Sequence, residues 1–335
     1  MKNQYYQQIR GLCIILVVMI HLPLGLDTGV SSFLWTGIRQ IINFPVATFV
    51  FLSAYFCKYD SRMLVKDFYI KRLKRLLIPY FWGAVLYLVL LPYIREHHLG
   101  EDAVFRFLTG YGPAYFLLAL AQLTIITPLI FKYKGSKMFR IISWLITPTY
   151  LVLYYVVLLF YGKEIPASQT PFFAWYVFYF IGIVYREDIL RFGKKLGKVT
   201  MCFFIVVALI LSSIESYLVL NYSGVYSFAI SQIKMSSIIY SLIVIVYFVC
   251  NAQDTDGNRL TKLGDYSMGI FMLHPFFNWL FKFVLIHLNL LDYNSFPGVT
   301  FNHLVICLCS IVCSFCTSFY ANKYYPNVAK TLGLV

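Results

Sequence analysis

The chain has 335 residues, of which 60% are hydrophobic and 13% are charged, and its mean hydropathy is +0.72. A water-soluble domain with so few charged side chains could not cover its surface with polar groups, so we expect lipid to be the solvent. The formal net charge of +14 raises the question of nucleic acid, but the basic residues lie in short loops between apolar runs. Anionic lipid head groups explain that distribution, and we predict no nucleic-acid binding.

Apolar runs follow one another along the whole sequence. A helix that crosses a bilayer needs about 20 apolar residues, and we predict an all-α, polytopic membrane protein with about ten transmembrane helices. The connections are too short to hold a separately folded unit, so residues 1–335 are expected to form a single domain. The predicted spans are residues 10–26, 40–57, 76–94, 114–131, 139–161, 172–186, 199–219, 228–250, 266–288 and 301–321.

The lysines and arginines predict the orientation of these spans, because basic residues in short loops are retained in the cytoplasm. With the N-terminus inside, most of the 28 Lys and Arg fall on the cytoplasmic side. Only Arg39, Arg95, Arg106 and Lys163 fall in loops on the outer side. A single missed or invented span would exchange the sides of every later loop. We therefore expect both termini to be cytoplasmic and the protein to be multi-pass.

The first predicted span carries two polar side chains, Arg10 and His21, that are costly in a bilayer. Eleven positions at about 100° per residue bring both side chains to one helix face, about 16 Å apart along the axis. Two interpretations stay open. The arginine anchors the helix at the cytoplasmic boundary while the imidazole bonds a neighbouring helix, or the two residues form a functional pair.

A basic cluster precedes the third predicted span and contains Lys71, Arg72, Lys74 and Arg75. A topology signal has the same composition. However, Arg72 and Arg75 lie three residues apart on one helix face, and the planar donors of arginine are suited to phosphates. Together with Arg10 they would form a cationic entrance on the cytoplasmic side, which suits a ligand that carries phosphates.

Ionisable residues are few in the later spans. His274 precedes Pro275 and either lines a cavity or caps a kinked helix. Lys234 and Lys282 either face a cavity or extend toward the membrane surface, and Glu215 lies near a span. No spacing of cysteines, histidines and acids is typical of a metal site, and we predict that no metal is bound.

Five segments, taken in order along the chain, share a pattern with a known family. They are Arg10, ten residues and His21; Pro45-Val-Ala-Thr-Phe-Val-Phe-Leu-Ser53-Ala-Tyr-Phe; Arg72-x-x-Arg75 followed by Pro79-Tyr80; Tyr115-Phe-Leu-Leu; and Ser267-Met-Gly-Ile-Phe-Met-Leu-His274. In this order they resemble acyltransferase family 3, membrane O-acyltransferases that acylate bacterial cell-surface polysaccharides and related glycans. The resemblance extends from about residue 7 to about residue 290, and the ten-span layout is also similar.

The chain departs from the family pattern at three places. Gln7 stands where the family often has Asp, Ser53-Ala54-Tyr55 replaces the usual Ser-Gly-Phe, and Gly-Pro-Ala precedes Tyr115 where many members have His. These departures concern the placement of substrate more than the class of reaction.

The resemblance implies an O-acyltransferase, with acetyl-CoA or another acyl-CoA as donor and no metal. It implies that Arg10, Arg72 and Arg75 bind the phosphates of the donor, whose pantetheine arm extends between the helices toward His21. His21 is then the general base for a sugar hydroxyl, or it relays the acyl group across the membrane. Ser53 either donates a hydrogen bond to the thioester carbonyl or bonds its own helix backbone.

The same resemblance implies partners and a location. The acceptor would be a cell-surface or lipid-linked polysaccharide, the protein would contact lipids of the bacterial inner or plasma membrane, and His274 and Tyr115 would line the active cavity. An alternative function is export or flipping of a polysaccharide or a lipid-linked glycan intermediate. Ion-coupled carriers usually have intramembrane carboxylates and repeated halves, and the sequence shows neither clearly.

Overall fold

The computed structural model describes residues 3–22, 29–60, 64–90, 102–290 and 296–334. These residues are almost entirely helical and contain no β-strand. The longer helices are α1 (Gln4–Ile20), α2 (Gly29–Ile41), α3 (Pro45–Tyr55), α4 (Val65–Ala84), α7 (Tyr115–Tyr133), α8 (Lys137–Tyr161), α9 (Tyr176–Val184), α10 (Arg186–Ser223), α12 (Met235–Cys250), α14 (Ser267–His287) and α15 (Phe296–Tyr324). The shorter ones are the π-helix η1 (Val85–Leu90), α6 (Ala103–Thr109), η2 (Gly112–Ala114), η3 (Phe172–Ala174), α11 (Tyr226–Ala229), α13 (Arg259–Asp265) and α16 (Pro326–Thr331).

The structure confirms the all-helical class predicted from the sequence. Within the described residues, seven helical segments are long and apolar enough to cross a bilayer. Each of the ten predicted spans coincides with a helix, but α1, α9 and α12 have only 17, 9 and 16 residues. These three are shorter than the length of about 20 residues that a crossing needs. Ten spans with both termini in the cytoplasm therefore stay a prediction.

Several predicted boundaries were wrong by more than a turn, and two of them concern the candidate site residues on α1 and α4. The first span was predicted to reach residue 26, whereas α1 ends at Ile20, because a residue that precedes a proline, here Leu22 before Pro23, avoids the helical conformation. The third span was predicted from residue 76, whereas α4 begins at Val65. The prediction missed the first residues of α4 because hydropathy detects only the apolar part of a helix. The basic cluster therefore lies within α4 and not before it.

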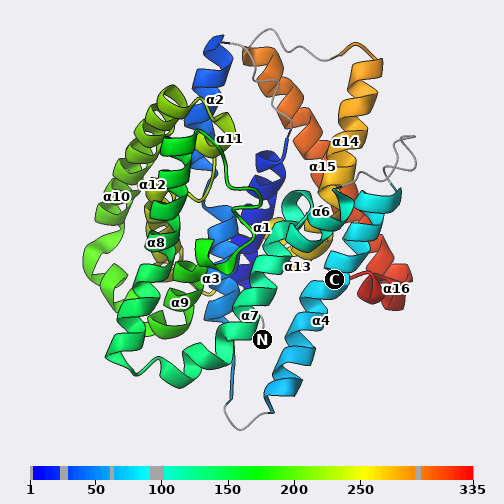
Figure 1. The fold of residues 1–335 in the computed structure, drawn as a ribbon. Helices are drawn as coiled ribbons and strands as arrows, with labels where there is room; N and C mark the ends of the chain where they lie inside the picture. Colours follow the sequence, from blue (N-terminus) through cyan, green and yellow to red (C-terminus); the bar gives the residue numbers. More distant parts are fainter. Residues whose placement is uncertain (1–2, 23–28, 61–63, 91–101, 291–295, 335) are drawn as a thin grey trace.

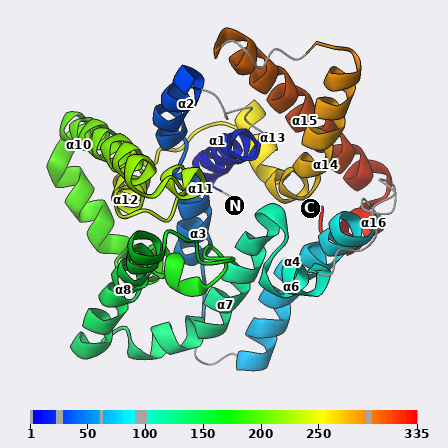
Figure 2. The same ribbon diagram turned by 45° about the horizontal axis from the view of Figure 1, so that its top comes forward.

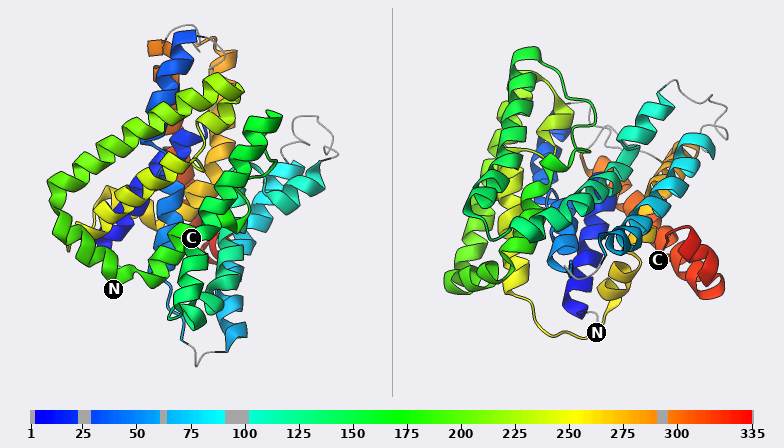
Figure 3. Two further views of the ribbon diagram at one scale, coloured as in Figure 1. Left: turned by 60° about the vertical axis from the view of Figure 1, so that its left-hand side comes forward. Right: turned by 60° about the horizontal axis from the view of Figure 1, so that its bottom comes forward.

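The helix α1 lies in the middle of the bundle (Figures 1 and 2). On one side lie α8, α10 and α12, and on the other lie α14 and α15. Near the N-terminus α1 runs beside α13 (Figure 3, right). The backbones approach closely there, since a Cβ atom on Gly11 would lie 2.0 Å from Leu260 O and one on Gly264 would lie 2.0 Å from Gln7 O. The two glycines thus allow the contact that fixes the position of α1.

The helices α1 and α3 run antiparallel, and their contacts define which residues share a level in the bundle. Tyr6 Oη lies 3.5 Å from Tyr55 Oη, and the thiol of Cys13 bonds the side chain of Thr48. A step of seven residues forward along α1, from Tyr6 to Cys13, therefore corresponds to a step of seven residues back along α3, from Tyr55 to Thr48. Extended by the same step, this register places the end of α1, at His21, level with the last turn of α2.

Candidate active site

Two histidines meet at the end of α1. His21 is the C-cap residue of α1, and its ring centroid lies 5.5 Å from that of His274 on α14. His274 is fully buried, and its Nδ1 lies 3.1 Å from Ile270 O. Because a carbonyl oxygen only accepts, Nδ1 carries the proton and Nε2 of the neutral ring is an acceptor. That Nε2 has no hydrogen-bond partner among the described residues.

A local opening of α14 positions His274. Pro275 lacks an N–H, and beside it the hydroxyl of Tyr87 enters the helix. Tyr87 Oη donates to Met272 O at 2.6 Å and accepts from Phe276 N at 3.2 Å, so it replaces a hydrogen bond of the helix. Tyr87 belongs to the π-helix η1, and such irregular turns are frequent at functional sites. The sequence left open whether His274 only caps the kinked helix. In the structure, the hydroxyl of Tyr87 stabilises the kink.

Arg39 is a third member of this site, and the prediction that it lies in an outer loop was wrong. It lies within α2 and is 6% exposed. The second span was predicted from residue 40, eleven residues after α2 begins, so the charge count assigned Arg39 to the wrong environment. Arg39 interacts electrostatically with both His21 and Tyr115. Tyr115, predicted to line the cavity, is thus related to this site through Arg39.

A polar network, formed by Arg39, Gln40, Asn43, Ser212, Ser216 and Lys234, connects α2, α10 and α12. Lys234, whose position the sequence left open, is fully buried. Its Nζ donates to Gln40 Oε1 at 2.8 Å and to Ser216 Oγ. Glu215 lies nearby, and its carboxylate accepts hydrogen bonds from Ser236 N at 3.0 Å and from the hydroxyls of Ser236 and Tyr155.

The residues predicted to form the cationic entrance lie around the start of α1 and along α4. Arg10 is partly exposed and interacts electrostatically with Arg75 and Asp265. The guanidinium of Arg72 lies 5.3 Å from the ring centroid of Phe68. Arg186, which the sequence analysis did not single out, lies 4.5 Å from the ring centroid of Tyr55 at the same end of the bundle.

Ser53 lies far from the two histidines. It is two residues from Tyr55, which contacts Tyr6 near the start of α1. About 13 residues of helix, or roughly 20 Å at 1.5 Å per residue, therefore separate its level from that of His21. The structure places Ser53 at the level of Arg10 and does not bring it to the imidazole.

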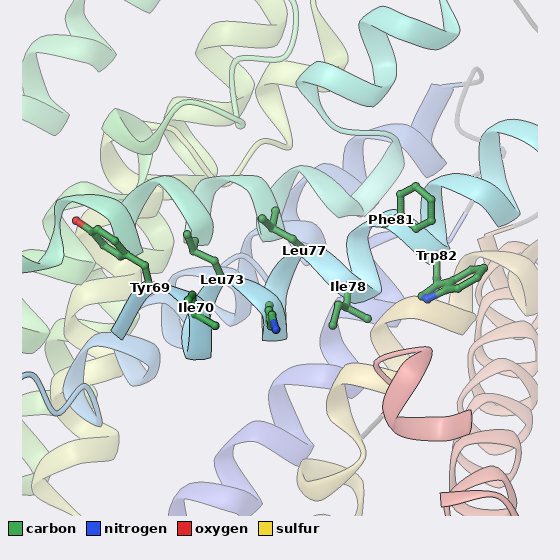
Figure 4. A pocket seen from close by; sticks show the side chains of 8 residues that line it. Tyr69, Ile70, Leu73, Leu77, Ile78, Phe81 and Trp82 are labelled. Carbon is green, nitrogen blue, oxygen red and sulfur yellow. The ribbon is translucent and has the colours of Figure 1, made fainter. Parts of the chain in front are cut away.

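A groove of about 420 Å³ runs along one face of α4 (Figure 4). It is lined by Tyr69, Ile70, Leu73, Lys74, Leu77, Ile78, Phe81 and Trp82. Because its lining is apolar apart from Lys74 and the hydroxyl of Tyr69, the groove is typical of a surface that contacts acyl chains of lipid. No group of three or more Cys, His, Asp or Glu side chains that could hold a metal ion occurs in the described part of the chain.

The fold and the site together define a multi-pass helical membrane protein with paired imidazoles inside the bundle and arginines at one end. The chain matches the model of the acyltransferase domain of acyltransferase family 3 over residues 3–322. It therefore belongs to that family, as the resemblance predicted.

Curated relatives share the family but are distant. The chain is 23% identical over 264 residues to proteins from Staphylococcus aureus strains MSSA476, MW2 and MRSA252. The match covers 74% of this chain and 72% of each relative, and all three are named "Probable poly-beta-1,6-N-acetyl-D-glucosamine export protein". No solved structure matches the chain.

Proposed function

We propose that the protein transfers an acyl group, in the first instance acetyl, from cytoplasmic acyl-CoA to a hydroxyl of a cell-surface or lipid-linked polysaccharide at a bacterial cell membrane. The observation that carries this proposal is the placement of Arg10 and His21 on one helix of a family 3 acyltransferase. The arginine interacts electrostatically with Arg75 at one end, and the imidazole lies beside His274 at the other.

The donor fits the distances along α1. Phosphates are bound well by the planar donors of arginine, and Arg10, Arg72 and Arg75 supply three such groups at one end of the bundle. About 16 Å of helix separates Arg10 from His21, which an extended pantetheine arm can cover. Ser53, at the level of Arg10, lies along the path of that arm and not at the thioester.

His21 is the proposed general base. Its ring nitrogen takes the proton of the acceptor hydroxyl while the oxygen attacks the thioester carbonyl, and the carbon–sulfur bond then breaks to release coenzyme A. His274 is the other member of the pair, and its Nε2 is an acceptor. It can therefore orient the imidazole of His21 or the hydroxyl of the acceptor sugar. Tyr115 interacts electrostatically with Arg39.

Purified protein in phospholipid vesicles tests the proposal. The measured quantity is the release of coenzyme A from acetyl-CoA in the presence of a β-1,6-linked N-acetylglucosamine oligomer. We expect His21→Ala to lower this release by at least about 100-fold, the contribution typical of a general base. His287→Ala is the matched control, because His287 is an exposed histidine on α14 that also bonds the carbonyl four residues earlier. Release unchanged in His21→Ala would contradict the role given to His21.

Export is the second candidate function, and the name of the Staphylococcus aureus relatives favours it. The same vesicles separate the two functions. Movement of the oligomer across the membrane without acyl-CoA supports a carrier, whereas release of coenzyme A that depends on the oligomer supports the transferase.

A further inference from the structure

The guanidinium of Arg39 is buried without a full set of partners. Its Nη1 donates to Asn43 Oδ1 at 2.6 Å, but its Nε has no hydrogen-bond partner in the described part of the chain. The hydroxyls of Tyr115 and Tyr226 also interact with it, but both are neutral near pH 7 and do not balance its charge. A buried cation with an unused donor is costly inside a membrane, and such residues usually have a function.

The location of this donor points to the function. Arg39 and His21 interact electrostatically, and the register of α1 against α3 places them at one level. Negative charge develops beside His21 when a hydroxyl attacks a carbonyl carbon, because the carbonyl oxygen becomes an oxyanion. A guanidinium in a region without bulk water interacts strongly with such a charge.

A chain of hydrogen bonds fixes Arg39 from behind. Asn43, which accepts from Arg39, donates through Nδ2 to Gln40 Oε1 at 2.8 Å. Gln40 Oε1 also accepts from Lys234 Nζ at 2.8 Å and from Ser212 Oγ at 3.1 Å. Three donors thus bind one oxygen. These bonds orient the side-chain amides of Gln40 and Asn43, and therefore also Asn43 Oδ1, the oxygen that accepts from Arg39. The network reaches α10 and α12, so the position of Arg39 does not depend on α2 alone.

We propose that Arg39 is a catalytic residue whose Nε–H binds the oxyanion of the acyl transfer, and that Asn43, Gln40 and Lys234 are positioning residues for it. This inference rests on the proposed acyltransferase function. The acceptor oxygen bonds the carbonyl carbon, the π electron pair moves to the carbonyl oxygen, and His21 takes the hydroxyl proton. When the carbonyl forms again, the carbon–sulfur bond breaks, His21 gives the proton to the departing sulfur, and coenzyme A leaves as the thiol.

The test compares variants of Arg39 and Lys234 in the vesicle assay, with acetyl-CoA and the β-1,6-linked N-acetylglucosamine oligomer. We expect Arg39→Gln to lower kcat by about 100-fold, the loss typical of one oxyanion donor, with the KM for acetyl-CoA within threefold of wild type. Lys234→Met should lower kcat by about tenfold, because a less well oriented guanidinium stabilises the oxyanion less. Arg106→Gln, an exposed arginine paired with Asp102, is the matched control.

A double variant separates positioning from a merely structural role. If Lys234 acts through Arg39, Arg39→Gln combined with Lys234→Met has the kcat of Arg39→Gln alone. Multiplied losses in the double variant would contradict the positioning role. If Arg39→Gln does not insert, Arg39→Lys decides, because lysine lacks the fork of donors, and a wild-type kcat in that variant would overturn the inference.

The outcomes also distinguish this inference from the proposed function. Arg39→Gln with wild-type kcat, beside an inactive His21→Ala, overturns the role of Arg39 and leaves the acyltransferase function intact. Wild-type protein that releases no coenzyme A overturns the function itself.

Discussion

The two groups of cations in this protein lie in opposite environments. At the cationic entrance, Arg75 is exposed and Arg10 and Arg72 are partly exposed. In the polar network, Arg39 is 6% exposed and Lys234 is fully buried. The entrance residues have few fixed partners in the described structure, whereas the network residues form hydrogen bonds with amides and hydroxyls.

This difference separates residues that attract a ligand from residues that hold a reacting group. Exposed charges are screened by water and salt, so each contributes little alone and several act together. Buried polar groups are unscreened, and loss of one partner leaves the other unsatisfied. We therefore expect single substitutions at the entrance to change affinity mildly and substitutions in the network to change stability or kcat strongly.

Displacement of α1, which connects the two regions, should have the largest effect. A side chain at Gly11 would collide with the backbone of Leu260, so we expect Gly11→Leu to abolish the recovery of folded protein. Gly135→Leu is the control, because a Cβ atom there meets nothing within 4 Å. Gel filtration of the detergent-solubilised variants measures the folded fraction. Normal recovery of Gly11→Leu would show that α1 and α13 can separate.

Gln40→Leu should be the next most severe change. It removes the oxygen that accepts from Lys234, Asn43 and Ser212, so we expect about 3 kcal/mol of lost stability. Gln8 also bonds through its amide, to Asp256 O at 2.9 Å, but at an exposed site. Gln8→Leu should therefore cost less than about 1 kcal/mol. Equilibrium unfolding in mixed detergent measures both, and equal losses would remove the distinction between the two regions.

Arg75→Gln tests the entrance. We expect the KM for acetyl-CoA to rise about threefold to tenfold with kcat unchanged. An exposed arginine at the entrance binds the donor equally well in the ground state and in the transition state. The rise should shrink at high salt. Lys137→Gln, an exposed cation at the start of α8, should leave KM unchanged. A fall in kcat without a change in KM would place Arg75 at the chemistry instead.

Tyr87→Phe should give the smallest effect. It removes the hydroxyl that bonds Met272 O and Phe276 N at the kink of α14, for which we expect about 1 kcal/mol of lost stability. A small fall in kcat should accompany it, because His274 lies in this turn. Tyr69→Phe, which loses one bond to Ile125 O on the exposed side of α4, is the control and should leave kcat unchanged.

Much of this arrangement follows from local sequence. The spacing of Arg10 and His21 predicts that both side chains lie on one face of one helix. In the structure, α1 contains Arg10 and ends with His21 as its C-cap residue. The apolar runs predict helices because no other backbone form satisfies its polar groups in lipid except a closed barrel. The family pattern predicts that Tyr115 and His274 line the active cavity, and in the structure His274 lies beside His21 while Tyr115 interacts electrostatically with Arg39.

The rest depends on contacts between distant segments. Arg39 was assigned to a loop because hydropathy detects apolar length and not a polar helix that other helices cover. The pair Arg39 and Asn43, four residues apart, was the available signal of a polar helix face. Lys234 could not be placed because its partners lie on α2 and α10, and Ser53 could not be separated from His21 without the register of α1 against α3.

The most direct test of the central claim is a structure of the protein bound to a non-hydrolysable thioether analogue of acetyl-CoA. The distance from the analogue's carbonyl carbon to the His21 ring is the decisive quantity. We predict that the carbonyl lies within contact of His21, with the phosphates at Arg10, Arg72 and Arg75. A carbonyl held elsewhere, for example along the groove of α4, with His21 out of reach, would contradict the role of His21 as the base of an acyl transfer.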